Sequence, residues 1–174
     1  MAHNVLISLL GPDRVGLVAA VTGRLFDLGA NLGDTSFAVL GTGYEFTSVA
    51  EVPDELTAER IADELRALPI LAGSNVAVTD FMHEPVHDES GRVTHRIRVA
   101  GGDRPGLVAR LTEVFVEFEA NVVRMNSERV PEPGGVRYAT VFHVSIPGPR
   151  AAGCLAAVAN TAEQLQMTCT FEET

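Results

Sequence analysis

Hydrophobic and polar positions along the first half of the chain follow two periods in turn. Residues 5–10 form a short apolar run typical of a buried strand, a second strand is expected from Asn31, and residues 44–52 and 76–81 are expected strands as well. Elsewhere apolar residues return every three or four positions, as on one face of an amphipathic helix. Thr57 is the expected N-cap of the second helix and Pro69 its expected end. The helical stripes are Val18, Val21, Leu25 and Leu28, and then Ile61, Leu65 and Leu68.

The second half has the same order of elements. Residues 94–100 predict a strand in which apolar residues alternate with Arg96 and Arg98, so one face of its sheet is expected to contact water. Further strands are expected from Asn121, over residues 136–146 and over residues 167–171. The helical stripes are Val108, Leu111, Phe115 and Phe118, and then Leu155, Val158, Ala162 and Leu165.

The two halves are also related residue by residue. Residues 13–31 align with residues 103–121 without a gap, and nine of the 19 positions are identical, where ordinary composition gives about one by chance. Gly29 predicts a left-handed stop for the first helix, whereas Glu119 replaces it in the second copy and leaves room for a different helix end. The chain is therefore an internal duplication.

This order predicts the fold class. Strand-helix-strand-strand-helix-strand, with right-handed crossovers and both helices on one face of an antiparallel sheet, is the ferredoxin-like α+β arrangement. We expect one module over residues 1–82, a polar linker over residues 83–92 and a second module over residues 93–174. Leu6 and Leu10 are expected on the sheet face away from the helices, where an apolar patch usually marks a contact.

Charge narrows the range of partners. Thirteen Lys and Arg stand against 23 Asp and Glu, a net charge of −10, which repels phosphate backbones and anionic lipid. We therefore expect no direct contact with nucleic acid or membrane. The apolar run at 5–10 is too short to span a membrane and has no cationic lead-in. Cys154 and Cys169 lack metal-ligand or CxxC spacing, so we expect reduced thiols in a cytoplasmic protein.

A Gly-x-Asp-Arg-x-Gly-Leu-Val-Ala motif, placed between a strand and a helix and followed by Ala-Asn after the helix, occurs at residues 11–19 and 101–109. It resembles the motif of the ACT domain, a regulatory module that binds amino acids and related small ligands. Two such modules without a catalytic domain are similar to the tandem-ACT proteins of the glycine-cleavage-system transcriptional repressor type. The resemblance covers the chain apart from the linker and the extreme ends. It departs from the family pattern at Val15, where the second copy has the usual proline, Pro105.

The loop between first strand and first helix is the expected ligand site in each copy. Backbone amides at a helix start lack intrahelical partners and carry the positive end of the helix dipole, so they suit a carboxylate. Glycine there allows close approach of a ligand. The resemblance implies that the asparagine opening the second strand also contacts the ligand. The candidate residues are Asp13, Arg14, Gly16, Leu17 and Asn31 in the first copy, and Asp103, Arg104, Gly106, Leu107 and Asn121 in the second.

Each candidate also has a structural interpretation. Asp13 and Asp103 are typical helix N-caps, and an asparagine after a helix often satisfies turn backbone. Arg14 and Arg104 are more often solvated, and the two glycines can simply allow close packing. The second copy is the favoured site, because Pro105 pre-sets the backbone angle for a helix start.

Side chains able to bind a metal gather around the expected linker. His83, Glu84, His87, Asp88 and His95 cluster near the linker, but Pro85 prevents the helical spacing that would bring His83 and His87 together. We expect no metal and no cofactor. Three functions stay open: a non-enzymatic amino-acid-binding regulator acting through protein association, a structural interaction module without a ligand, and an unrecognised enzyme. We expect the first, as a homo-oligomer with a possible protein partner.

Overall fold

The computed structural model describes residues 2–102 and 105–174, which form two compact units. The chain divides between Pro85 and Val86, within the stretch expected to be a linker. Each unit is described by itself. No helix within the described ranges is long and apolar enough to cross a membrane.

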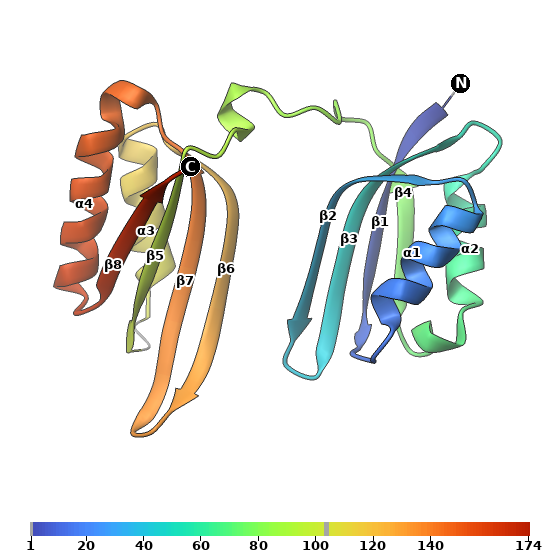
Figure 1. Cartoon of the computed structure of the whole chain (residues 1–174), viewed down its shortest axis with the longest axis horizontal. Coiled ribbons are helices and arrows are strands. Elements are labelled where there is room, and N and C mark those ends of the chain that lie inside the picture. Colours follow the sequence, from blue (N-terminus) through green and yellow to red (C-terminus); the bar gives the residue numbers. More distant parts are fainter. Residues whose placement is uncertain (1, 103–104) are drawn as a thin grey trace. The chain divides into compact units, whose positions relative to one another are not determined.

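The first unit is a four-stranded antiparallel sheet with two helices on one side (Figure 1). The strands lie in the order β2-β3-β1-β4. The elements are β1 (Ala2–Pro12), α1 (Leu17–Asp27), β2 (Asn31–Leu40), β3 (Gly43–Pro53), α2 (Ala58–Arg66), the 3₁₀ turn η1 (Pro69–Leu71) and β4 (Asn75–Asp80).

The second unit repeats this topology with the strand order β6-β7-β5-β8. Its elements are the 3₁₀ turn η2 (Glu89–Gly91), β5 (His95–Gly102), α3 (Leu107–Glu117), β6 (Asn121–Glu132), β7 (Gly135–Ser145), η3 (Gly148–Arg150), α4 (Ala151–Gln164) and β8 (Thr168–Glu173). Both units have the strand-helix-strand-strand-helix-strand order, so the predicted ferredoxin-like fold is confirmed.

The two cores form where the helices cover their sheet. In β1, Val5, Ile7 and Leu9 are buried and alternate with the half-buried Leu6 and the exposed Leu10, as the sequence pattern predicts. The predicted helical stripes are one residue out of phase at the helix starts. Leu17 and Leu107 are buried, whereas Val18 is 39% exposed and Val108 is only partly buried. The stripes therefore begin at the residue directly after each glycine.

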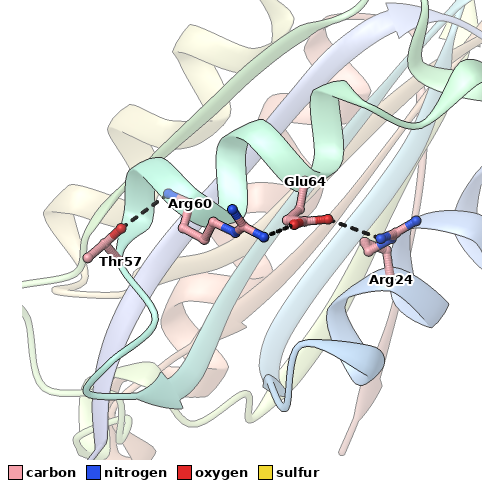
Figure 2. A network of polar contacts seen from close by, with 4 residues as sticks. All are labelled: Arg24, Thr57, Arg60 and Glu64. Carbon is pink, nitrogen blue, oxygen red and sulfur yellow. Dashed lines mark hydrogen bonds and ion pairs between the residues drawn. The ribbon is translucent and has the colours of Figure 1, made fainter.

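A polar network joins the two helices of the first unit (Figure 2). Thr57 caps α2, because its hydroxyl accepts a hydrogen bond from the Arg60 amide at 3.2 Å, as predicted. Glu64 forms ion pairs with two guanidinium groups, that of Arg24 on α1 at 3.0 Å and that of Arg60 on α2 at 2.6 Å. Because a carboxylate shared by two arginines has little freedom to move, this network fixes α1 beside α2.

Part of the expected linker is folded onto the second unit. Asp88 caps η2 by accepting from Ser90 and from the Gly91 amide, and these hydrogen bonds hold the pKa of its carboxyl below the ordinary value. The turn is bound to the sheet through its carbonyls: Asn121 donates to Ser90 O at 2.8 Å and Ser145 to Glu89 O at 3.3 Å. Residues 88–91 therefore belong structurally to the second unit.

The helix ends of the two copies are alike, contrary to the difference that Glu119 suggested. Gly29 has φ 80° and Glu119 has φ 55°, both left-handed. The hydrogen bonds also match, since Ala30 N bonds Leu25 O at 3.0 Å and Ala120 N bonds Phe115 O at 2.8 Å. This is the Schellman arrangement in both copies. Backbone geometry is retained in the second copy although a side chain makes it less favourable.

Because residue 119 is strained, we expect a glycine variant there to be more stable than an alanine variant, the reverse of the usual order in a helix. Both Glu119→Gly and Glu119→Ala lose the ion pair with Arg150, but only glycine adopts a left-handed angle without a penalty. We expect the Gly variant to be more stable than the Ala variant by about 1 kcal/mol, measured by urea unfolding.

The matched control is Glu113, an exposed residue inside α3. There Gly should be less stable than Ala by about 1 kcal/mol, as in any helix interior. The same order at both positions would show that residue 119 is not strained.

Candidate ligand-binding site

Both first helices begin at a glycine in the left-handed conformation. Gly16 has φ 89° and Gly106 has φ 82°, and each is the N-cap residue of its helix without a side-chain cap. The expectation that Asp13 caps α1 is therefore wrong: the cap position lies three residues later, and the exposed Asp13 bonds the turn through its own amide, which donates to Thr42 O at 3.1 Å. Any other residue at either glycine would be strained. The glycines thus set the direction in which each helix leaves its loop.

In the first unit, Arg14 ties this loop to η1. Its guanidinium donates to Ile70 O at 2.7 Å, to Ala72 O at 2.9 Å and to Pro69 O at 3.5 Å. The Ile70 side chain lies beside the helix start, 3.9 Å from where a Cβ on Gly16 would stand. Arg14 is exposed but is not simply solvated, because most of its hydrogen-bonding groups hold backbone carbonyls.

The second unit has a cavity at the corresponding place. About 230 Å³ of space is lined by the first helical residues of α3 together with Arg129 of β6 and Tyr138 of β7. A Cβ on Gly106 would meet no described atom within 4 Å. The candidates Asp103 and Arg104 lie outside the described residues. The full set of lining residues is Pro105, Gly106, Leu107, Val108, Ala109, Arg129 and Tyr138.

The lining of this cavity matches a carboxylate. The first amides of α3 carry the positive end of the helix dipole, and Arg129 adds a full positive charge with a planar pair of donors. The Tyr138 hydroxyl can donate or accept. Leu17 and Leu107 are each 1% exposed, so they can offer a ligand only their backbone. The site is a small polar pocket suited to an anionic group.

The structure does not bring the two candidate asparagines to these loops. Asn31 lies opposite Glu51, which lies opposite Asn4, whereas the loop leaves β1 at Gly11 and Pro12. Seven residues of strand separate Asn4 from Gly11, about 23 Å at the usual rise. In the second unit Asn121 lies opposite Ser145, at the far end of the sheet from Gly102, and holds η2. The expected grouping of loop and asparagine within one module is corrected accordingly.

The sequence prediction missed Arg129 and Tyr138. A signal existed for the tyrosine, because Tyr44 and Tyr138 correspond in the repeat. Their surroundings differ, however. Tyr44 is buried, stacks on Phe37 and donates to the Ser74 hydroxyl, and Val39 lies opposite it where the second copy has Arg129. The charged position on the second strand distinguishes the two copies, and no motif marked it.

The two cysteines and the possible metal ligands are the other reactive groups. Burial raises the pKa of the Cys154 and Cys169 thiols, so both are protonated and weakly nucleophilic at neutral pH. Cys154 is buried and Cys169 is half-buried, and the two are not joined to each other. Among the residues that the structure describes, no group of three or more His, Cys, Asp or Glu could hold a metal ion.

The fold, the duplication and the two glycine-initiated helices define the class of this protein. ACT domain models match residues 3–79 and residues 95–152. The chain belongs to the ACT domain family and consists of two such domains in tandem.

Similar proteins show which members of this family the chain resembles. The glycine cleavage system transcriptional repressor of Escherichia coli K12 is 27% identical over 172 residues, covering 97% of this chain and 85% of that protein. A protein of unknown function from Galdieria sulphuraria has the same fold, with a TM-score of 0.78 at 23% identity over 100% of this chain and 99% of its own. A solved structure provisionally assigned as a glycine cleavage system transcriptional repressor gives a TM-score of 0.69 at 12% identity, over 100% and 98%. The chain is thus a regulatory ACT protein similar to those repressors.

The role of Arg14 can be tested through stability. Arg14→Met keeps much of the apolar stem but removes the three bonds to η1, so the free energy of unfolding of the first unit should fall by about 1 kcal/mol, less than for buried hydrogen bonds because these are exposed. Urea unfolding measures it. The control is Arg110→Met on α3, an exposed arginine whose side chain has no hydrogen bond or ion pair to the described residues. Equal effects of the two variants would contradict a structural role for Arg14.

Proposed function

We propose that the protein is a non-enzymatic cytoplasmic regulator that binds a small carboxylate-bearing ligand, an amino acid, in its second ACT domain. The observation that carries the proposal is the cavity of about 230 Å³ at the start of α3, with Arg129 and Tyr138 in its wall. Pockets for drug-sized ligands span about 300–1,000 Å³, so the volume suits a smaller molecule. Family membership supports the same ligand class.

The carboxylate would lie against the first amides of α3 and pair with the Arg129 guanidinium. Charge-assisted hydrogen bonds of this kind are stronger than neutral ones and fix orientation. The Tyr138 hydroxyl would then face the rest of the ligand. Pro105 stiffens the approach to the helix start, so little ordering entropy would be lost when the ligand binds.

The first domain is proposed to have a structural role instead. Its equivalent loop is hydrogen-bonded to η1 through Arg14, and Ile70 lies beside Gly16. Val39 replaces the arginine that the second copy supplies. These contacts favour a module that no longer binds a ligand and serves association, the alternative that the sequence left open.

The output would be a change in protein association. A ligand shifts a conformational or assembly equilibrium only by its difference in affinity for the two states, and couplings of about 1–3 kcal/mol are typical. The curated relative is a transcriptional repressor, while the net charge of −10 on this chain disfavours direct contact with DNA. Regulation would therefore act through a partner protein and through self-association.

A ligand screen tests the proposal. A ligand that binds the native state raises the melting temperature, so at least one of the common amino acids should do so in a thermal-shift screen of the full chain. Arg129→Met should then weaken that ligand by about tenfold or more in calorimetry, because a charged hydrogen bond is lost. Tyr138→Phe should weaken it less.

Asn121→Ala is the matched control in the same domain. Its side chain lies at the other end of the sheet and bonds Ser90, so the affinity should not change. No shift with any amino acid would contradict the ligand class. Loss of binding in Asn121→Ala with normal binding in Arg129→Met would move the site to the opposite end of the sheet.

A further inference from the structure

Each sheet has one face that no helix of its own unit covers (Figure 1). The register of the strands identifies the residues on these two open faces. The open face of the first sheet carries Leu6, Ser8 and Leu10 of β1 with Glu45, Thr47, Val49 and Glu51 of β3. The open face of the second sheet carries Arg96, Arg98 and Ala100 of β5, Arg137, Ala139, Val141 and His143 of β7, and Arg124 of β6.

The two open faces have opposite charge. Residues 1–85 contain four arginines against twelve Asp and Glu, whereas residues 86–174 contain nine against eleven. On the first open face the charged groups named above are both glutamates. On the second, the four arginines outnumber the three glutamates Glu128, Glu132 and Glu172, of which Glu132 pairs with Arg137. The duplication has thus placed acidic and basic versions of the same surface in one chain.

Several groups on the second open face lack a counter-charge. The side chains of Arg98 and Arg124 have no ion pair or hydrogen bond to any described residue, and Arg96 meets Glu172 only at 3.6 Å. Between them His143 has a buried Nδ1 without a hydrogen-bond partner in the described part of the chain. Its burial, with Arg96 and Arg124 nearby, lowers the pKa of His143. Unpaired polar groups of this kind favour a covering surface that supplies carboxylates.

The first open face offers such carboxylates, and a hollow lies beside one of them, Glu45. Ser8, Leu10 and Thr47 line about 370 Å³ of space together with Glu45, and the lining is mostly apolar. Leu10 is 55% exposed, which is costly for a leucine in water. Glu51 has no ion pair within the described ranges. This face therefore has an exposed leucine opposite Glu45 at one end and a second carboxylate, Glu51, at the other end of β3.

Two sheets stacked face to face lie about 10 Å apart with their strands nearly aligned. The glutamates of the first open face can therefore lie opposite the unpaired guanidinium groups of Arg98 and Arg124 on the second.

We propose that the open face of the first sheet docks onto the open face of the second sheet in another copy of this chain. Two copies related by a two-fold axis would make this contact twice, which closes the assembly. Four strands at about 4.8 Å and six residues at about 3.3 Å give a footprint of about 400 Å² per face. Two faces per chain then reach about 800 Å² per partner, the size of a standard stable interface.

This dimer rests on the self-association in the proposed function and assigns a surface to it. It can be tested without a ligand. Sedimentation velocity of the full chain should show a dimer at high protein concentration that weakens in high salt. An acidic-face variant, Glu45→Arg with Glu51→Arg, should lose at least about 100-fold in dimer affinity, because like charges then face each other. A basic-face variant, Arg98→Glu with Arg124→Glu, should lose as much.

Mixing the two variants is the decisive step. In the mixture each reversed face meets a face of opposite charge on the other variant, so a heterodimer should form although neither variant dimerises alone. Matched controls reverse exposed charges away from the open faces, Glu55→Arg and Arg110→Glu, and should dimerise normally. Circular dichroism checks that every variant is folded.

A monomeric parent chain, a dimer that both reversals leave intact, or a mixture of folded variants that does not associate would each overturn the proposal. None of these results bears on amino-acid binding, because the cavity at α3 is lined by other residues.

Discussion

The structure depends on burial of a single face of each sheet. Two amphipathic helices cover that face, and the residues between them are almost fully buried, from Ile7 and Phe46 in the first unit to Ile97 and Phe142 in the second. Because side chains alternate along a strand, this choice also decides which residues stay outside. The helix-bearing face provides the cavity beside α3, and the uncovered face provides the charged surfaces. Both proposed functions therefore depend on residues that the burial of the core leaves accessible.

Duplication has kept the backbone and changed the chemistry attached to it. Both first helices start at a left-handed glycine and both end in a Schellman turn, even where Glu119 must adopt a positive φ. The surroundings of the helix start differ, because Arg14 ties the loop to η1 in one copy and a cavity with Arg129 lies beside it in the other.

Much of the fold was predictable from sequence, for a physical reason. Element order, the strand starts at Asn31 and Asn121 and the Thr57 cap depend on local periodicity and local hydrogen bonds, which a sequence shows directly. The Glu119 turn was not predictable, because packing of the whole unit outweighed the local preference of that residue. The site was only half predictable. The glycine loop is local, but Arg129 reaches it from β6, and the distance to Asn121 follows from strand direction, which a linear motif does not show.

The two cysteines have a practical consequence that follows from where they lie. Both belong to the second unit, Cys154 fully buried on α4 and Cys169 half-buried on β8, and the first 153 residues contain none. A buried thiol reacts with an alkylating reagent only when its surroundings open. The labelling rate of Cys154 therefore reports local opening of the second ACT domain alone, because the first domain has no cysteine to label.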